Sequence, residues 1–291
     1  MKQKYNYLLF FLFLSPVILY LAIFFIYPLG LLFYYSLTKF DYKNKIRYFV
    51  GLENFIEIFK DPETYGHIFR TFLYTGIVVF LSFILGLGYA VLVYSIKSKL
   101  MNTLLRIIIV TPMLIMPVAG ATIWRFLLSV HYGWINFILE LLGFQRENWL
   151  LSPYAFYWVM ITDIWGWSPY IFLIMYAALQ QLPQSILDSS EVDGATSFRK
   201  YMYVIFPILK PVMIIALTLK TLDTYRAFDY IWVMTGGGPG HSSTTLNIAT
   251  YITAVQYLNF EKSSAYGILT MLFPLFLTIS LLIYTRVKKI E

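Results

Sequence analysis

The sequence predicts an all-α integral membrane protein with six transmembrane helices and a helix–turn–helix loop on the cytoplasmic side. Of the 291 residues, 59% are apolar and only 13% are charged, whereas soluble domains contain about a quarter charged residues. Aromatic residues make up 20%, which is typical of chains with wide contact to lipid and its interface. Six apolar stretches are long enough to cross a bilayer core, which takes about 20 residues of helix.

The first apolar stretch follows Lys2 and Lys4 and therefore also resembles a secretory signal. It is much longer than the roughly 7–15 apolar residues of a signal peptide, and no A-x-A-like cleavage site follows it. We therefore expect a retained first helix. The predicted spans cover about Tyr7 to Leu37, Phe69 to Ile96, Leu104 to Val130, Pro153 to Leu179, Val204 to Val233 and Ala265 to Arg286.

The positions of Lys and Arg orient these spans, because cytoplasmic connections carry an excess of both residues. With both termini in the cytoplasm, the internal segments contain Lys2, Lys4, Lys97, Lys99, Arg106, Arg199, Lys200, Lys210, Arg286, Lys288 and Lys289. The segment from Thr38 to Arg70 is then external and fits less well, since it contains six Lys or Arg. The connection from about Tyr132 to Ser152 is predicted to form a short interfacial helix on the outside.

Composition excludes several functions. The chain has no Cys, so disulfides and thiolate metal sites are excluded. His67, His131 and His241 lie far apart in the sequence, outside any metal-ligand spacing, and no metal site is predicted. No Gly-Lys-Ser/Thr of a Walker A motif is present, so ATP would have to be bound by another chain. The net charge of +7 is attributed to the cytoplasmic bias of Lys and Arg and to anionic lipid, and no nucleic-acid binding is expected.

The loop between the fourth and fifth spans, from Leu182 to Pro211, is too polar for lipid and too patterned for a slack linker. Pro183 ends the fourth span, because a proline disfavours helix in the residue before it. A short helix then follows to about Val192, and Gly194 permits the left-handed turn that stops it. Thr196 or Ser197 caps the next helix. The prediction is a helix–turn–helix elbow on the cytoplasmic side.

This elbow resembles the EAA loop that marks the membrane subunits of binding-protein-dependent ABC importers, whose pattern is Glu-Ala-Ala-x-x-Asp-Gly-Ala followed by a proline-containing stretch. The matching residues are Asp188, Ser189, Ser190, Asp193, Gly194, Ala195 and Pro207. Asp188 replaces the Glu of the pattern with a shorter acid, and two Ser replace the two Ala. The resemblance implies that the loop docks on a cytoplasmic ATPase.

Other stretches resemble the carbohydrate-uptake permeases, the family of the maltose and glycerol-3-phosphate importers. The matching stretches are Phe49–Phe55 with Asp61-Pro62, Trp124-Arg125 with Tyr132–Asn136, Trp165–Pro169, and Phe228–Pro239 with its Gly-Gly-Gly-Pro turn. The resemblance implies a type I ABC importer fold in the cytoplasmic membrane of a prokaryote. It divides the chain into a first helix with its external loop (1–68), a permease domain (69–286) and a cytoplasmic tail (287–291).

The resemblance also implies the partners and the reaction. They are a second permease subunit, two cytoplasmic ATPase subunits and an extracytoplasmic solute-binding protein, assembled in the lipid bilayer. ATP and Mg²⁺ would be bound by the ATPase partner, so this chain needs no cofactor and is no enzyme. It would translocate a sugar or sugar-like solute by alternating access, with the elbow as the lever.

Charged side chains within spans are costly and call for a reason, at about 2.5–3.5 kcal/mol each. Asp163 in the fourth span either bonds another helix or lines the substrate path, where Trp165 and Trp167 would stack on sugar faces. In the fifth span Lys220, Asp223 and Arg226 share one helix face. They form either an intrahelical network or a substrate-contacting face, and two cations against one acid leave room for an anionic substrate.

Two other functions would use some of the same residues. An ion-coupled secondary transporter or channel would use Asp163 and the charges of the fifth span as its coupling site. An alcohol phosphatidyltransferase also carries Asp-Gly, but its signature continues with Ala-Arg and two spaced acids. Here Thr196 follows Ala195, and the next acid is Asp223. The enzyme is therefore disfavoured.

The elbow generates a first prediction. Gly194→Val should abolish transport with little loss of membrane insertion, because a β-branched residue does not readily adopt a left-handed turn. Uptake would be measured at equal protein level in the membrane, and wild-type uptake by the variant would contradict the elbow.

Overall fold

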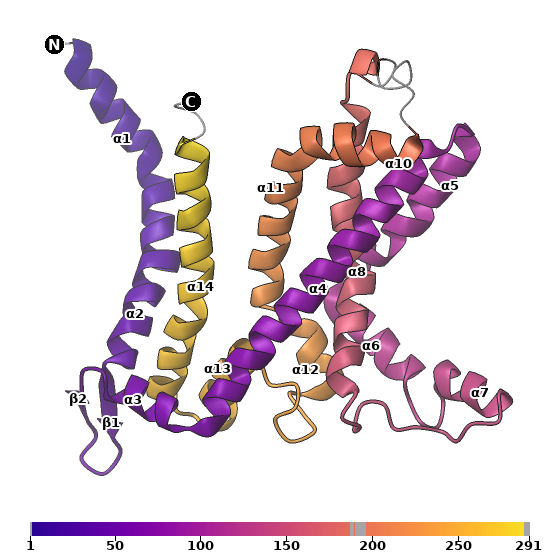
Figure 1. Ribbon diagram of the computed structural model, residues 1–291. Helices are drawn as coiled ribbons and strands as arrows, with labels where there is room; N and C mark the ends of the chain where they lie inside the picture. The colour runs from indigo at the N-terminus through magenta and orange to yellow at the C-terminus, as the bar shows by residue number, and fades with distance from the viewer. Residues whose placement is uncertain (1, 187–188, 190–195, 288–291) are drawn as a thin grey trace. The chain divides into compact units, whose positions relative to one another are not determined.

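The computed structural model describes residues 2–186, 189 and 196–287, and it is predominantly helical (Figure 1). The elements are α1 (Lys2–Leu21), the π-helix η1 (Ala22–Ile26), α2 (Tyr27–Ser36), β1 (Thr38–Asp41), β2 (Ile46–Phe49), α3 (Glu53–Lys60), α4 (Pro62–Ser95), α5 (Lys99–Val110), the 3₁₀-helix η2 (Thr111–Leu114), α6 (Pro117–Leu127), α7 (Trp134–Leu141), α8 (Ala155–Gln180), α10 (Ser197–Arg199), the π-helix η3 (Lys200–Ile205), α11 (Phe206–Tyr225), α12 (Asp229–Thr235), α13 (Leu246–Tyr251), the π-helix η4 (Ile252–Gln256) and α14 (Phe260–Val287).

The predicted membrane architecture is confirmed. Within the described residues, five helices are long and apolar enough to cross a membrane, and there are six if one bent helix pair is a single span. The five cover Phe10–Ser36, Pro62–Ser95, Ala155–Gln180, Lys200–Thr235 and Phe260–Ser280. The predicted external loop also contains a two-stranded antiparallel hairpin, in which Thr38 pairs with Phe49.

The predicted third span, over Leu104 to Val130, is not one straight helix in the structure. Lys99–Leu114 and Pro117–Leu127 meet at 97°. Ile115 and Met116 between them have extended backbones, with ψ angles of 126° and 138°. Pro117 explains the break, because a proline pushes the residue before it out of the helical region.

The fifth span is also interrupted. α11 ends at Tyr225 and α12 starts at Asp229, whereas the sequence predicted one helix to Val233. The carbonyl of Arg226, which a helix end leaves without an intrahelical partner, accepts a hydrogen bond of 2.8 Å from the Asn247 side chain. An asparagine from the segment after α12 therefore satisfies the broken end of α11.

The chain forms two compact units. The first, Met1–Tyr65 with Ala249–Glu291, packs α2 along α14, as Figure 1 shows. The hydroxyl groups of Thr64 and Tyr266 lie 2.7 Å apart in its interior. The Arg47 guanidinium lies 4.5 Å from the ring centre of Tyr35 and pairs with Glu261 at 2.7 Å. Contacts between distant parts of the sequence therefore hold this unit together.

The hairpin of this unit is fixed by a buried asparagine. The Asn54 side chain donates hydrogen bonds to the carbonyls of Ser36, at 2.8 Å, and Thr38, at 3.0 Å. It thereby satisfies carbonyls where α2 passes into β1. At the surface, the hydrogen bond to Glu57 is the largest of the interactions that raise the pKa of the Lys39 ammonium. The segment predicted to be external is therefore ordered by a hairpin and by specific hydrogen bonds.

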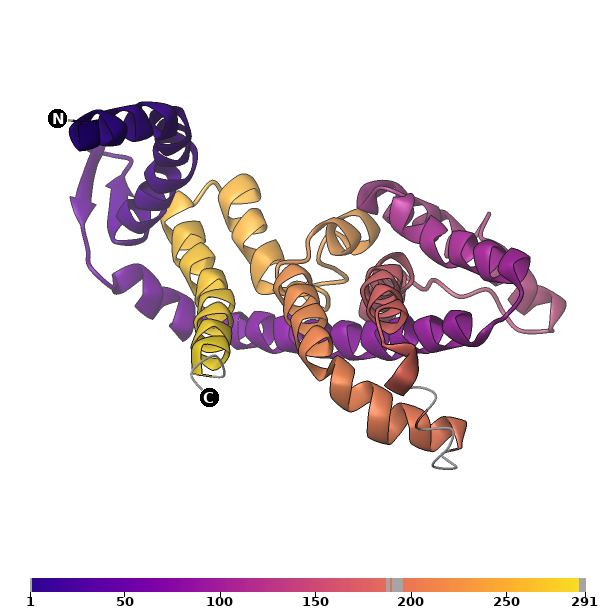
Figure 2. The same ribbon diagram turned by 90° about the horizontal axis from the view of Figure 1, so that it is seen from above.

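The second unit, Gly66–Ile248, is built around α8, whose buried residues occur along its whole length. Figure 2 shows α8 beside α4 when the unit is seen from above. The two helices meet closely at Gly86. A Cβ atom there would lie 2.6 Å from Cβ of Ile171 and 2.7 Å from the carbonyl oxygen of Ser168. Only glycine permits this approach.

This contact generates a second prediction. Gly86→Ala should lower the free energy of unfolding by about 1–3 kcal/mol, because α4 and α8 must separate to admit the methyl group. Gly88→Ala is the matched control, since a Cβ at Gly88 meets nothing within 4 Å and alanine favours helix. Thermal unfolding in detergent would compare them, and equal midpoints would refute the close contact.

Candidate functional site

A buried ion pair and a hydrogen bond to it join three helices of the second unit. Nζ of Lys220 on α11 lies 2.9 Å from Oδ1 of Asp163 on α8, and the two side chains are 1% and 4% exposed. The Tyr74 hydroxyl on α4 donates a hydrogen bond of 2.8 Å to the other carboxylate oxygen, Oδ2. Both oxygens of Asp163 therefore have partners within the protein.

The pair explains why two charges are present within apolar spans. Each charge is costly in hydrocarbon, and a buried pair is tolerated where geometry is good and the remaining polar atoms are hydrogen-bonded. The Lys220 ammonium also lies 5.7 Å from the ring centre of Trp167, within the range of a cation–π contact. We call Tyr74, Asp163 and Lys220 the buried triad.

The geometry separates the residues that the sequence grouped on one face of the fifth span. Lys220 pairs with Asp163 and not with Asp223. Asp223 and Arg226 lie 3.9 Å apart, with side chains 50% and 72% exposed. The intrahelical Lys–Asp–Arg network is therefore wrong for Lys220, and Asp163 makes the interhelical bond that the sequence left open.

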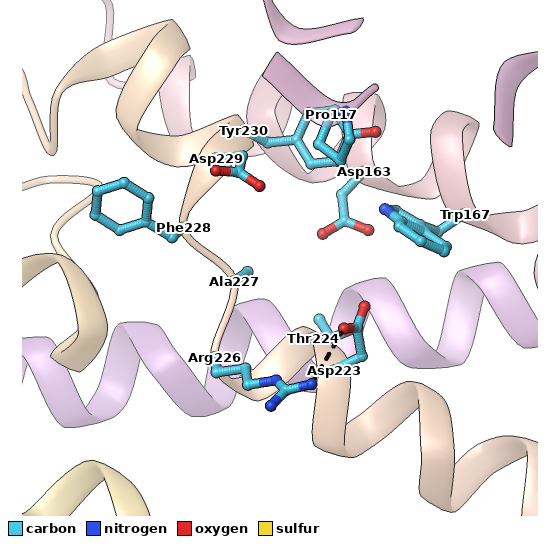
Figure 3. Close-up of a pocket in the computed structure, with 10 residues that line it drawn as sticks. All are labelled: Pro117, Asp163, Trp167, Asp223, Thr224, Arg226, Ala227, Phe228, Asp229 and Tyr230. Carbon is cyan, nitrogen blue, oxygen red and sulfur yellow. Dashed lines mark ion pairs between the residues drawn. The ribbon is translucent and has the colours of Figure 1, made fainter. Parts of the chain in front are cut away.

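A cavity of about 180 Å³ lies at the break between α11 and α12 (Figure 3). It is lined by Pro117, Asp163, Trp167, Asp223, Thr224, Arg226, Ala227, Phe228, Asp229 and Tyr230. Four of the six candidate substrate-path residues thus lie at one place, namely Asp163, Trp167, Asp223 and Arg226. Lys220 is not among the lining residues, although its ammonium is bonded to Asp163, which is.

Trp165 does not line this cavity, which corrects its pairing with Trp167 as a sugar platform. Its ring packs against Trp124, with ring centres 5.9 Å apart, and Trp124 in turn contacts Trp158 at 6.2 Å. Residues two apart on a helix do not share a face, so Trp165 and Trp167 point to different surroundings. Trp165 belongs to an aromatic cluster between α6 and α8.

The cavity also contains residues that sequence reasoning missed. Tyr230, only 5% exposed, packs against glycines on two helices. Its ring lies 3.6 Å from where a Cβ of Gly120 would be, and a Cβ at Gly166 would overlap its hydroxyl. Asp229 begins α12, where a helix terminus favours an acid. The only available signal was the change from an apolar run to Phe-Asp-Tyr, which does not specify a helix break.

Most of the predicted coupling loop lies outside the described residues, namely Asp188, Ser190, Asp193, Gly194 and Ala195. Ser189 is helical, and its hydroxyl donates a hydrogen bond of 3.1 Å to the carbonyl of Ile186. The described chain resumes at Thr196, and helical structure leads through η3 into α11, with Pro207 in its first turn. Helical segments therefore border the loop on both sides.

Two histidines that are distant in the sequence lie together. The rings of His67 and His241 have centres 5.8 Å apart, and Arg70 donates a hydrogen bond of 3.0 Å to the Thr244 carbonyl beside them. The described residues contain no group of three or more His, Asp or Glu that would hold a metal ion. The contact joins the start of α4 to the loop before α13.

The family model for the binding-protein-dependent transport system inner membrane component matches residues 82–289, which is more than half of the chain. The chain belongs to this family. As an inner membrane component it is 32% identical over 284 residues to the trehalose/maltose transport system permease protein MalF of Thermococcus litoralis, covering 96% of this chain and 93% of that protein. The sulfoquinovosyl glycerol transport system permease protein SmoG of Agrobacterium fabrum is 31% identical, with 95% and 90% covered.

The fold of this inner membrane component is also found in solved transporters. A bacterial alginate ABC transporter, in complex with an alginate pentasaccharide-bound periplasmic protein, gives a TM-score of 0.84 at 21% identity, covering 96% of this chain and 94% of that chain. This match confirms the predicted type I importer fold. The relatives confirm the resemblance to the carbohydrate-uptake permeases.

The buried triad generates a third prediction. Asp163→Asn should lower the free energy of unfolding by about 3–5 kcal/mol, because it leaves the Lys220 ammonium buried without its counter-charge. Combining it with Lys220→Met should cost less than the sum of the two single changes.

Unfolding midpoints of the two single variants and the double variant would measure this coupling. Asp223→Asn is the control, since exposed pairs contribute at most about 1 kcal/mol. Strictly additive effects of the two triad changes would show that the ion pair is not formed.

Proposed function

We propose that this chain is one of two membrane-spanning subunits of an ATP-driven, binding-protein-dependent importer that carries a sugar or sugar-like solute across the cytoplasmic membrane of a prokaryote. Membership of the inner membrane component family supports the transport function. The relatives named above transport trehalose and maltose or sulfoquinovosyl glycerol, which are carbohydrates or their derivatives. Both termini are assigned to the cytoplasm from the distribution of Lys and Arg.

The single observation in the geometry that supports this proposal is the polar cavity at the α11–α12 break. It places carboxylates, an arginine and a tryptophan within otherwise apolar spans. Its volume of about 180 Å³ is below the roughly 300–1,000 Å³ of a complete ligand pocket. We infer that it is half of a site, which the second permease subunit completes.

The coupling mechanism uses the helices that border the elbow. α8 leads into the loop of Asp188 to Ala195, and α11 leads out of it. Because the buried triad bonds α4, α8 and α11 to one another, a push on the loop moves these three helices together. Closure of the cytoplasmic ATPase pair would thus turn the cavity outward. ATP and Mg²⁺ belong to those partners, and this chain supplies no catalytic group.

An ion-coupled secondary transporter is less well supported. It would need a titratable or ion-coordinating group free to exchange its ligand, and the candidates were Asp163 and the charges of the fifth span, of which the structure binds Asp163 and Lys220 to each other. The two oxygens of Asp163 are bonded to Lys220 and Tyr74, and its side chain is 4% exposed. The geometry therefore favours a structural role for this carboxylate.

The proposal predicts a specific cross-link. Because the chain has no Cys, Ser189→Cys introduces a single thiol at the elbow. A bifunctional reagent should join it to an ATP-hydrolysing companion chain in native membranes. Glu147→Cys, in the connection predicted to be external, is the matched control and should capture no ATPase.

Uptake into vesicles tests the same proposal independently. Transport should require the companion ATPase and the binding protein together with ATP. Transport by the purified chain alone under an ion gradient would overturn the importer and favour the secondary transporter.

A further inference from the structure

The cavity contains more acidic side chains than the sequence of the fifth span suggested. Two cations and one acid on the fifth span left room for an anionic substrate. The cavity brings Asp163 from α8 and Asp229 from α12 to the same place as Asp223 and Arg226. When Lys220, the partner of Asp163, is counted as well, three carboxylates stand against two cations. An anion would enter a site with one excess negative charge.

The ion pairing also determines which of these groups can contact a solute. The Lys220 ammonium is 1% exposed and bonded to Asp163, so neither charge is available. Asp223 and Arg226 are held only loosely, at 3.9 Å, and both are exposed. Asp229 is exposed and has no hydrogen bond or ion pair with any described residue. Asp229 and the weakly paired, exposed Asp223 and Arg226 can therefore contact a ligand.

A fourth polar group points to a ligand independently. The Thr224 side chain lines the cavity (Figure 3) and is 2% exposed. Its hydroxyl has no hydrogen-bond partner among the described residues. A buried hydroxyl without a partner costs free energy, so a partner is expected from outside the chain.

The donor and acceptor properties of these groups select the solute. Ionised Asp223 and Asp229 only accept hydrogen bonds, whereas Arg226 only donates them. A carboxylate, sulfonate or phosphate offers acceptors alone and would satisfy Arg226 but not the two acids. An ammonium offers donors alone and would satisfy the acids but not Arg226. A hydroxyl group does both.

We infer that the half-site on this chain recognises an uncharged, polyhydroxylated solute, a neutral sugar or polyol, and disfavours anionic sugars. This inference rests on the proposed function and names the substrate class within it. Hydroxyl groups of the solute donate to Asp223 and Asp229 and accept from Arg226. The half-buried ring of Trp167 supplies an apolar surface for the C–H face of a sugar ring.

The experiment uses the whole complex, purified from native membranes through this chain with its companions and reconstituted into vesicles with its binding protein. ATP-dependent uptake is compared between a panel of neutral mono-, di- and trisaccharides that includes trehalose and maltose, and anionic probes, namely sn-glycerol 3-phosphate, hexuronates and an alginate pentasaccharide. Uptake confined to neutral probes is the expected result.

Faster uptake of an anionic probe than of every neutral one would overturn the inference while leaving the importer intact. Absence of ATP-dependent uptake for both sets would overturn the proposed function itself. The two failures are thus distinguishable.

Variants of the cavity residues then test whether this cavity is responsible for the preference for neutral solutes. Asp223→Asn and Asp229→Asn keep the shape of each side chain and remove its charge, so each should slow uptake of the neutral sugar by about tenfold, the value of a hydrogen bond to a charged group. Glu147→Gln makes the same chemical change at an exposed side chain outside the cavity and should leave uptake unchanged.

An anionic solute gives the opposite sign. Removing two negative charges from its path would speed uptake in the double variant Asp223→Asn/Asp229→Asn, and such an increase would overturn the inference. Co-purification of the companion chains measures assembly of each variant. If a variant fails to assemble, the comparison of neutral and anionic probes on the wild-type complex still decides.

Discussion

The second unit depends on one constraint, which is that a charge within a membrane span must be neutralised and fully hydrogen-bonded. Asp163 meets it with Lys220 at 2.9 Å and Tyr74 at 2.8 Å. Each partner comes from a different helix, so the requirement fixes how α4, α8 and α11 pack. The same two helices, α4 and α8, also meet closely at Gly86. Packing and charge neutralisation therefore support the same arrangement.

Much of the fold could be predicted because it depends on local properties. Apolar length located the five helices that can cross a membrane and the bent pair that makes a sixth if it is a single span, and the motif of the predicted elbow pointed to the family that the comparisons confirm. The broken third span was also within reach, since Pro112 and Pro117 stand inside it. The interruption of the fifth span was not, because Arg226, Ala227 and Phe228 contain no proline or glycine. The group that satisfies the broken end, the Asn247 side chain, lies 21 residues further along the sequence and reaches the Arg226 carbonyl only in the folded chain.

The sequence predicted most of the residues that lie at the candidate site, but it did not predict which of them form ion pairs with one another. Helical spacing placed Lys220 and Asp223 on one face, which suggested that they neutralise each other. The partner of Lys220 lies 57 residues earlier in the sequence, and no local pattern indicates such a contact. The roles of Trp165 and Trp167 were equally unpredictable from local sequence. The Trp165 ring packs against Trp124 and Trp167 lines the cavity, and both contacts involve residues distant in the sequence. Asp229 and Tyr230 reach the cavity only because the helix break turns α12 toward α8.

The first unit has a consequence for how the protein is made. α2 packs on α14, and the hydroxyls of Thr64 and Tyr266 bond across 202 residues of sequence. A ribosome releases α2 long before it has synthesised α14, and domains otherwise form in the order of synthesis. α2 must therefore remain in the lipid without its packing partner until α14 has been synthesised. Until then Arg47 also lacks its ion-pair partner Glu261. Assembly of this unit therefore cannot finish before α14 has been synthesised, and loss of α14 would leave α2 without its packing partner.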